Sequence, residues 1–315
     1  MIKHSHMSVH RIHVETPLIE SLALSRRVSG RVWLKMEALQ PCGSFKARGI
    51  GFACQRYREQ GRKRFVSSSG GNAGLAVAYA GRQLGVPVTV IVPQSTSERA
   101  KELICDESAE VIVWGQSWQE AHQHALTLVD VEAAYLHPFD DPLIWEGHAS
   151  LIDEVLTAGL KPDAVLLSVG GGGLLCGVAE GLQKAGLSKV VLVTSETIGA
   201  ESFYKSVQAG EVVELERISS VATTLGAKQV ARQALEVSRN FEVIPHVVTD
   251  REAIDACLLF ADDHRVVVEP ACGAALALVY KNVDALKDVK DILLIVCGGA
   301  GVNYGKLVEL KAGAS

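Results

Sequence analysis

The chain has 315 residues, of which 48% are hydrophobic, and this length suits two α/β lobes better than one core. A formal net charge of -5 argues against a nucleic-acid partner, and no apolar run approaches the length of a membrane span. The seven cysteines form no Cys-x-x-Cys pair and no signal peptide is visible, so we expect reduced thiols and a cytoplasmic protein. We exclude the polar leader, residues 1–7, from the expected fold.

Short apolar strands alternate with helical patterns along the chain. In chain order, strands are expected at 32–34, 88–92, 110–113, 164–167, 190–193 and 292–296, with helices between them, for example at 75–80, 97–105 and 119–129. Alternation of this kind predicts parallel sheets with helices on both faces. We therefore expect an α/β fold of two open parallel-sheet lobes, with a ligand site in the crevice between them.

The two lobes are expected to divide the chain unevenly. Residues 42–135 would form the smaller domain, and residues 1–41 together with 136–315 would form the larger one. No low-complexity linker marks the boundary. Pro138 and Pro142 interrupt regular structure at the place where the chain returns to the larger domain.

The segment 41–49 contains one lysine, Lys46, between a Gly-Ser turn and a predicted helix start. An apolar run, 50–54, follows it. A lysine held against apolar surroundings loses part of its preference for the charged form and becomes an amine nucleophile. An ordinary lysine at a helix N-terminus would also explain this segment, and two further segments favour the catalytic interpretation.

The second segment, 67–74, is a run of serines and glycines between the apolar pair Phe65-Val66 and a predicted helix. A loop of this kind offers free backbone N–H groups and hydroxyls, and the helix dipole favours an anion there. A plain turn capped by serine would need one serine and one glycine only. The segment therefore predicts a site for a carboxylate.

Four consecutive glycines follow the predicted strand 164–167, namely Gly170, Gly171, Gly172 and Gly173. A backbone without side chains can wrap closely round a phosphate with its N–H groups alone. The spacing matches neither the dinucleotide-binding nor the Walker pattern, so a compact phosphate monoester is the expected guest. A nucleophilic lysine, a carboxylate loop and a phosphate loop together indicate pyridoxal phosphate bound to an amino acid.

These segments, in this order, resemble the fold type II pyridoxal-phosphate enzymes, the family of the tryptophan synthase β subunit. The matching motifs are Ser-x-Lys-x-Arg-Gly at 44–49, Ser-x-Gly-Asn at 69–72 and the glycine-rich loop. The resemblance extends from about residue 16 to the end of the chain. It is strongest for the serine/threonine dehydratase branch, and within it for the subgroup with glycine before the Gly-Asn pair.

The resemblance implies a role for each matched position in the cofactor site. Lys46 would form the Schiff base with the cofactor, Phe45 would lie near its ring, and Asn72 would hydrogen-bond its ring hydroxyl. The larger domain would hold the phosphate through the glycine-rich loop, with Gly170, Gly171, Gly172, Gly173 and Leu174.

Cys297 falls where this branch places a neutral group beside the pyridine nitrogen. A thiol would leave that nitrogen largely neutral, which restrains carbanion delocalisation and favours prompt loss of a β-hydroxyl. A small buried hydrophobe after a strand would explain Cys297 equally well on its own.

The resemblance also implies a substrate site and a cation site. Ser69, Gly70 and Asn72 would bind the substrate carboxylate. A monovalent cation such as potassium would accompany the cofactor, because a carboxylate with several carbonyls suits a hard cation. A second explanation of Glu196 is that it caps the element that follows strand 190–193. The matched positions are Glu196, Ala200, Ser202, Leu225 and Ala227.

The activity implied is that of a lyase, the β-elimination of L-serine to pyruvate and ammonia, and of L-threonine to 2-oxobutyrate, in a homodimer. The freed amine of Lys46 would remove the α-proton.

Gly70 lacks the hydroxyl that related racemases use, which disfavours racemisation. In cysteine synthases, threonine usually stands at the place of Ala73 and serine at that of Cys297, which disfavours β-replacement. Both activities remain as alternatives.

Overall fold

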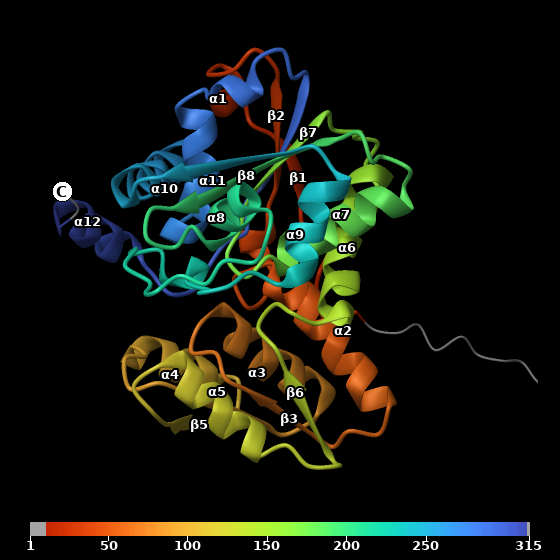
Figure 1. Cartoon of the computed structure of the whole chain (residues 1–315), viewed down its shortest axis with the longest axis vertical. Coiled ribbons are helices and arrows are strands. Elements are labelled where there is room, and N and C mark those ends of the chain that lie inside the picture. The colour runs from red at the N-terminus through yellow and green to blue at the C-terminus, as the bar shows by residue number, and fades with distance from the viewer. Residues whose placement is uncertain (1–10, 314–315) are drawn as a thin grey trace, which may run out of the picture.

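The computed structural model describes residues 11–313, and the leader at residues 1–7 lies outside them. Two separate sheets with helices around them confirm the predicted α/β class. In Figure 1 the four-stranded sheet lies below the six-stranded one, and helix α2 (Lys46–Glu59) lies where the two parts meet. None of the helices in this described part of the chain has the length and apolar character needed to cross a bilayer.

The six-stranded sheet has the order β1-β2-β10-β7-β8-β9. All neighbouring strands in it are parallel except β1, which pairs antiparallel with β2 at the edge. The strands are β1 (Leu18–Glu20), β2 (Arg31–Lys35), β7 (Ala164–Ser168), β8 (Val191–Thr197), β9 (Val243–Val248) and β10 (Asp291–Ile295).

The four-stranded sheet has the order β5-β4-β3-β6 and is parallel throughout. Its central strand β3 leads into the serine-glycine loop. The strands are β3 (Arg64–Ser67), β4 (Val88–Val92), β5 (Glu110–Val113) and β6 (Ala133–Leu136).

Helices connect the parallel strands, as right-handed βαβ units require. Helix α11 is apolar on nearly every side and is buried along residues 270–279, so it forms the centre of the larger core. The other helices are α1 (Leu22–Ser25), α3 (Asn72–Leu84), α4 (Glu98–Asp106), α5 (Trp118–Thr127), α6 (Pro142–Thr157), α7 (Gly173–Lys184), α8 (Ser202–Ala209), α9 (Arg232–Asn240), α10 (Asp250–His264) and α12 (Tyr304–Gly313), with α11 at Pro270–Tyr280 and the 3₁₀ turns η1 (Glu37–Leu39), η2 (Thr223–Leu225) and η3 (Asp284–Leu286).

The predicted strands are observed within one or two residues, with one exception. Strand β8 continues to Thr197, four residues beyond the predicted end at 193. Its last residues are polar in sequence but buried in the sheet, so their chemistry suggested a loop. The expectation that Glu196 follows the strand is therefore wrong, because Glu196 lies inside β8.

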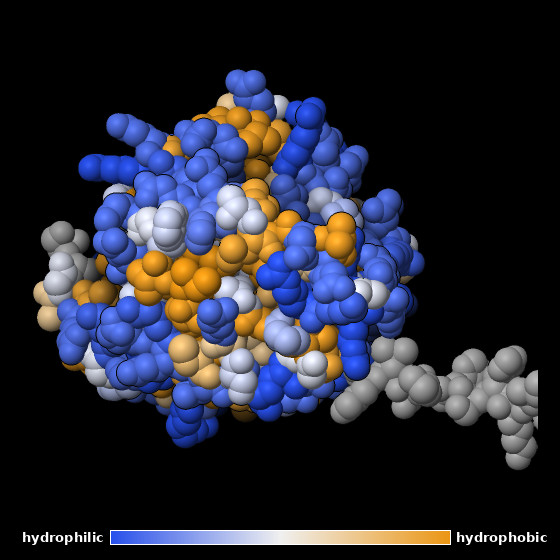
Figure 2. All heavy atoms as spheres, turned by 90° about the horizontal axis from the view of Figure 1, so that it is seen from below, coloured by the Kyte–Doolittle hydropathy of each residue, from blue (hydrophilic) through white to orange (hydrophobic). Residues whose placement is uncertain are grey.

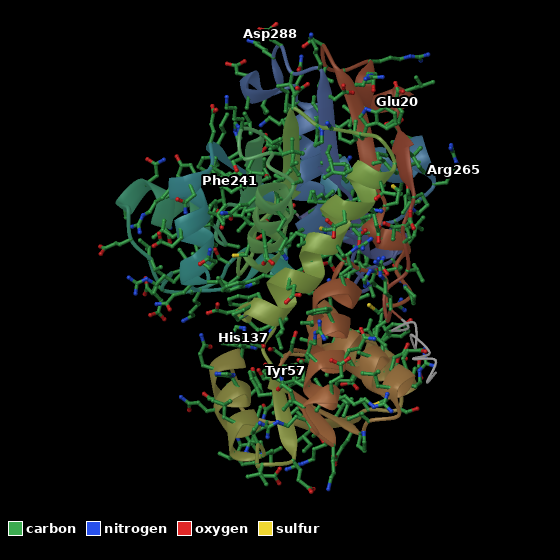
Figure 3. The ribbon with its side chains drawn as sticks, turned by 90° about the vertical axis from the view of Figure 1, so that its right-hand side faces the viewer. Glu20, Tyr57, His137, Phe241, Arg265 and Asp288 are labelled. Carbon is green, nitrogen blue, oxygen red and sulfur yellow. The ribbon has the colours of Figure 1, made fainter. Side chains whose placement is uncertain are left out.

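The crossing between the sheets runs from Leu136, where β6 ends, to Pro142, where α6 begins. Asp141 caps α6 by accepting a hydrogen bond from the Leu143 N–H at 2.8 Å. Asp141 also accepts from the Tyr57 hydroxyl of α2 at 2.7 Å. Figure 3 shows Tyr57 and, in the crossing, His137, both at the junction of the two parts. The crossing is therefore held against α2.

Four buried charged residues from four elements form what we call the buried charge cluster, namely Lys35 (β2), Glu37 (η1), Arg48 (α2) and Glu154 (α6). The Arg48 guanidinium has no exposed surface and donates to both carboxylates, with N···O distances of 2.6 to 2.8 Å. The Lys35 ammonium donates to Glu154 Oε2 at 2.5 Å and to the Thr16 carbonyl at 2.6 Å. Two cations thus balance two anions, and the cluster ties α2 to β2 and α6.

The cluster is stable only when it is complete. Burial alone would raise the pKa of Glu154, but hydrogen bonds from Arg48 and Lys35 hold this pKa below its ordinary value. Removing one partner of such a group leaves an unpaired charge in the interior, which costs more than the pair itself contributes.

We predict that Arg48→Met lowers the free energy of unfolding by about 3–5 kcal/mol, because it leaves buried Glu37 without its cation and Glu154 with Lys35 alone. Arg56→Met in the same helix is the control, since Arg56 is exposed, pairs with exposed Glu59 and lies over the Phe52 ring. Its effect should stay below about 1 kcal/mol. Urea unfolding followed by circular dichroism measures both. Equal losses for the two variants would contradict the role given to the cluster.

Candidate active site

The segments singled out in the sequence come together at the carboxyl ends of the parallel strands. Residues 43–46 run beside residues 297–299, with a bridge between Ser44 and Gly298 and a hydrogen bond from the Phe45 N–H to the Cys297 carbonyl at 3.2 Å. The Asn72 side chain accepts from the Ala300 N–H at 3.1 Å. The structure thus places Lys46, Asn72 and Cys297 in one site, which is the position expected for α/β sheets.

Lys46 is the first residue of α2, and its ammonium donates to the Pro138 carbonyl at 2.5 Å. Burial lowers the pKa of Lys46 to about 8, against the opposing influence of Cys297 and Glu269. The Nζ atom lies 5.0 Å from the centre of the Phe45 ring. A neutral amine is therefore accessible to this lysine near neutral pH, as a nucleophile or base requires.

Phe45 and a histidine form the apolar side of the lysine. The Phe45 ring lies 4.9 Å from the ring of His148, which is fully buried. Nδ1 of His148 accepts from the Gly49 N–H at 3.2 Å. Burial and the nearby cations Lys46 and Arg48 hold the pKa of His148 well below its ordinary value, so the imidazole is neutral. The sequence analysis missed His148, which no local motif marks.

The serine-glycine loop ends at the N-terminus of α3. The Ser69 hydroxyl accepts from the Gly71 N–H at 3.3 Å. Among the described residues, the N–H groups of Asn72, Ala73 and Gly74 have no acceptor, as expected for a first helical turn. Together with the positive end of the helix dipole, they form a seat for a carboxylate.

Gly70 lies against the neighbouring β4–α4 loop. A Cβ atom at Gly70 would stand 2.7 Å from Oγ1 of Thr96. A serine or alanine at this position would therefore require Thr96 to move. Thr96 occupies the space that a side chain at position 70 would take.

The glycine-rich loop joins β7 to α7 and has the features of a phosphate site. In the described part of the chain, the N–H groups of its four glycines donate no hydrogen bond, and they stand at the N-terminus of α7. A Cβ at Gly171 would lie 2.2 Å from the ring of Phe139, and Gly172 has φ +90°. Unpaired donors in a wall without side chains fit a phosphate group, so the chain's own residues suit pyridoxal phosphate.

Cys297 is 7% exposed and follows β10. Its contact with the Cys272 thiol, together with burial, raises the pKa of Cys297 well above its ordinary value. The side chain is therefore a neutral thiol, which is the property that a neutral pyridine nitrogen needs beside it.

Glu269 and Thr224 belong to the site although the sequence analysis gave them no role. Oε1 of Glu269 accepts from Asn72 Nδ2 at 2.7 Å and from the Thr224 hydroxyl at 2.5 Å. Burial raises the pKa of Glu269 to about 7, while hydrogen bonds from Thr224 and Asn72 oppose this shift. A glutamate inside the apolar stretch 266–279 was the one signal available for it.

The positions expected to bind a cation lie in β8, just after it, and at η2. The Glu196 carboxylate accepts from the N–H groups of Phe203 and Tyr204 at 2.9 and 2.6 Å, so it caps α8 from within β8. Burial raises the pKa of Glu196 to about 8. The Ser202 hydroxyl is fully buried and has no partner within the described residues.

The remaining expected cation ligands are a buried alanine, the last residue of η2 and a residue just after it. Ala200 is fully buried, between Glu196 and Ser202 in the chain. The Leu225 carbonyl lies 3.3 Å from the position that a Cβ of Gly170 would take, and it accepts from the Ala227 N–H at 2.7 Å. Leu225 thus lies beside the glycine-rich loop. Ala227 is linked to that loop by its hydrogen bond to Leu225.

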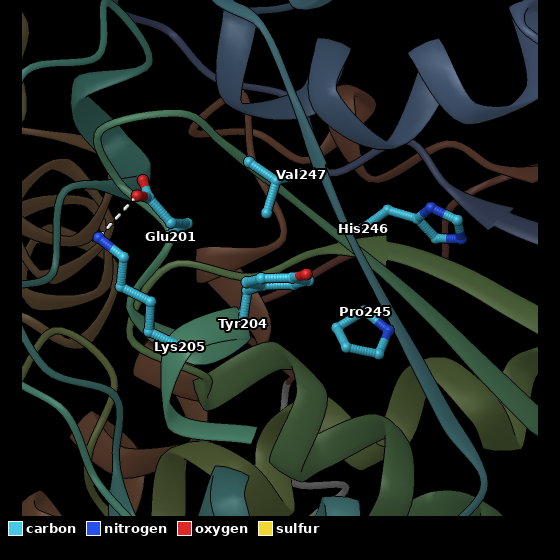
Figure 4. Close-up of a pocket in the computed structure, with 6 residues that line it drawn as sticks. All are labelled: Glu201, Tyr204, Lys205, Pro245, His246 and Val247. Carbon is cyan, nitrogen blue, oxygen red and sulfur yellow. Dashed lines mark ion pairs between the residues drawn. The ribbon is translucent and has the colours of Figure 1, made fainter. Parts of the chain in front are cut away.

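A surface hollow of about 380 Å³ lies between α8 and β9, apart from these loops (Figure 4). An ion pair of 2.8 Å joins two of its lining residues, Glu201 and Lys205. The hollow contains none of the residues of the three loops. Its lining residues are Glu201, Tyr204, Lys205, Pro245, His246 and Val247.

Comparisons with known proteins agree with this site. The chain is 46% identical over 316 residues to the human L-serine dehydratase/L-threonine deaminase, covering 97% of this chain and 96% of that protein. It is 45% identical over 320 residues to an L-serine dehydratase of Dictyostelium discoideum, covering 95% and 91%. The crystal structure of a fungal L-serine ammonia-lyase from Rhizomucor miehei is similar, with a TM-score of 0.91, 38% identity and coverage of 96% and 99%.

A model of a single family covers nearly the whole chain. Residues 9–298 match the family described as "Pyridoxal-phosphate dependent enzyme". This match includes Lys46, Asn72 and the glycine-rich loop, and it confirms the resemblance to the fold type II enzymes. The chain therefore belongs to the family of pyridoxal-phosphate-dependent enzymes.

Proposed function

We propose that this chain is a pyridoxal-phosphate-dependent ammonia-lyase that converts L-serine to pyruvate and ammonia, and L-threonine to 2-oxobutyrate and ammonia. The observation that carries the proposal is the Lys46 amine, whose pKa is lowered and which donates to the Pro138 carbonyl, next to the Phe139 that packs on the glycine-rich loop. Relatives named for serine dehydration and threonine deamination match nearly the whole chain.

The proposed roles follow from the chemistry of each group. Free N–H groups at the start of α3, with the Ser69 hydroxyl, hold the substrate carboxylate. The bound cofactor supplies the electron sink for the carbon that loses its proton. The neutral amine of Lys46 accepts the α-proton; the C–O bond at the β-carbon then breaks, and the hydroxyl takes up a proton and leaves as water, so that serine loses one water in all. The released enamine takes up one water and gives pyruvate and ammonia, so atoms balance.

Several contacts keep the other groups in place for this reaction. The glycine-rich loop holds the phosphate with Gly170, Gly171, Gly172, Gly173 and Leu174. Phe45 and the neutral His148 keep water from the lysine. The neutral thiol of Cys297 leaves the ring nitrogen without a proton, which favours rapid loss of the β-hydroxyl over other fates of the carbanion.

We propose that a monovalent cation, potassium for example, binds at Glu196, Ala200 and Ser202, with carbonyls of Leu225 and Ala227. Two features support a cation at this place. The buried Ser202 hydroxyl lacks a partner among the described residues, and the pKa of Glu196 is raised to about 8 by burial. A cation beside Glu196 would stabilise its ionised form and lower this pKa.

We also propose the domain division 42–135 against 1–41 with 136–315. Its support is that strands β3 to β6 form one sheet, although β6 ends at Leu136, one residue beyond the proposed boundary.

We further propose a cytoplasmic homodimer. All seven cysteines are free thiols, which supports the cytoplasm, a reducing compartment, as the location. Apolar residues gathered in the middle of the face in Figure 2 support association.

We predict that Lys46→Ala lowers the rate of pyruvate formation from L-serine at least about 1,000-fold, because the base and nucleophile are lost. Lys63→Ala, which changes an exposed lysine, is the control. Pyruvate is followed by coupling to lactate dehydrogenase, with L-threonine and D-serine assayed in parallel. A Lys46→Ala enzyme with undiminished activity would refute the assignment. A yellow wild-type protein that makes no pyruvate would point to β-replacement or racemisation.

The lowered pKa of Lys46 predicts the pH dependence of cofactor uptake. Because only the neutral amine attacks the cofactor aldehyde, the rate of uptake should rise with pH and level off above the pKa of about 8. An unperturbed lysine would show a rise that continues to about pH 10.4. Stopped-flow absorbance of the cofactor-free protein measures this rate. A rate still rising well above pH 9 would show that the lysine is not perturbed in this way.

The cation proposal predicts that KCl, compared with LiCl at equal ionic strength, raises the thermal midpoint and the serine-deaminating activity. At a hundredfold excess over Kd, a cation that binds only the folded state stabilises it by about 2.7 kcal/mol. Ser202→Ala should abolish the difference between the two salts, whereas Ser238→Ala, which removes a half-buried hydroxyl that donates to the Leu235 carbonyl within α9, should keep it. If the wild-type protein responds equally to both salts, the site does not select potassium.

A further inference from the structure

The side-chain amide of Asn72 is held from both ends, and this fixes its orientation. The Ala300 N–H can only donate, so the atom that faces it must be the carbonyl oxygen of Asn72. The opposite end must then be the NH₂ group, which donates to Glu269 Oε1 at 2.7 Å. A flipped amide would place two donors against each other at one end and two acceptors at the other.

An amide NH₂ has two protons, and the contact with Glu269 uses one of them. Within the described residues, Nδ2 of Asn72 makes no other hydrogen bond. The side chain is only partly buried, and it stands at the first turn of α3. Asn72 therefore offers the site an N–H donor and keeps its carbonyl turned away.

Glu269 is itself fixed in place. It is 5% exposed, and a Cβ at Gly299 would lie 2.0 Å from its carboxyl carbon. Oε1 also accepts from the Thr224 hydroxyl at 2.5 Å. This oxygen thus accepts from two donors, Asn72 Nδ2 and the Thr224 hydroxyl. Thr224 bonds only to Glu269 in this group, so it leaves the carbonyl oxygen of Asn72 free to accept from Ala300.

Thr224 connects this pair to both anion seats. Its methyl group lies 3.5 Å from the position that a Cβ of Gly71 would take, and its carbonyl 3.3 Å from the corresponding position at Gly170. Thr224 itself is exposed in this structure, on the 3₁₀ turn η2. It therefore contacts the carboxylate loop, the phosphate loop and Glu269 from the open side of the site.

We propose that Glu269 and Thr224 are positioning residues that act through Asn72, forcing its amide to present an N–H group to the ring hydroxyl of the cofactor. A donated hydrogen bond stabilises the ionised form of that oxygen, whereas a carbonyl turned toward it would repel this form. The inference rests on the proposed function, because it takes pyridoxal phosphate as the bound group.

A double-mutant cycle with two readouts tests this proposal. Cofactor-free wild-type, Asn72→Ala, Thr224→Ala and the double variant are titrated with pyridoxal phosphate to obtain Kd. The absorption spectrum of each loaded protein then reports the ionisation of the ring hydroxyl, independently of turnover. We expect Thr224→Ala and Glu269→Gln each to raise Kd about tenfold, the size of one lost charged hydrogen bond. Both should also shift absorbance from the visible band toward the ultraviolet band.

The cycle separates action through Asn72 from general support of the site. If Thr224 acts through Asn72, then Thr224→Ala has little further effect on Kd or spectrum when Asn72 is already alanine. Thr224→Ser, which keeps the hydroxyl, should behave as wild type, and so should Thr223→Ala at the neighbouring exposed position. Because Thr224 is exposed, its variants test the proposal even if Glu269→Gln fails to fold.

Two results would overturn the inference. One is a wild-type spectrum and Kd in both Thr224→Ala and Glu269→Gln. The other is full additivity of Thr224→Ala and Asn72→Ala, which would mean that the two residues act independently. Failure of the proposed function looks different, because the wild-type protein itself would then fail to bind pyridoxal phosphate, or would bind it and release no pyruvate.

Discussion

The pairing of Arg48 with two buried carboxylates is the constraint on which the site depends. Lys46 and Arg48 are two residues apart in α2, so their side chains leave the helix in nearly opposite directions. With Arg48 fixed to Glu37 and Glu154, α2 cannot rotate about its axis, and Lys46 is directed toward the Pro138 carbonyl. One helix turn thus carries both the reactive amine and the anchor that aims it.

Apart from Glu269, whose carboxylate accepts from Asn72 and Thr224, the remaining chemistry of the site relies on groups that stay neutral. Backbone N–H groups at the starts of α3 and α7 provide the anion seats, and Cys297 and His148 carry no charge. The ion pairs of the buried charge cluster lie on the side of α2 that is opposite Lys46. This separation leaves burial as the main influence on Lys46, which explains why its pKa falls to about 8 rather than rising.

Residues in strand-to-helix loops could be predicted from sequence, because small residues there have a clear local signature. Lys46, Asn72 and the four glycines are of this kind. Glu269 and Thr224 are 45 residues apart and meet only through the tertiary fold, so no local pattern joins them. The end of β8 was predicted four residues too early because its last residues are polar, and the burial of Arg48 could not be foreseen because sequence periodicity cannot reveal charges that are buried in pairs.

The central claim is that this protein carries pyridoxal phosphate on Lys46. Borohydride reduction of the loaded protein, followed by proteolysis and peptide mass spectrometry, tests it most directly. The account predicts one pyridoxyl group per chain, on the peptide that contains Lys46. A label on another lysine, or none after incubation with excess pyridoxal phosphate, would contradict it.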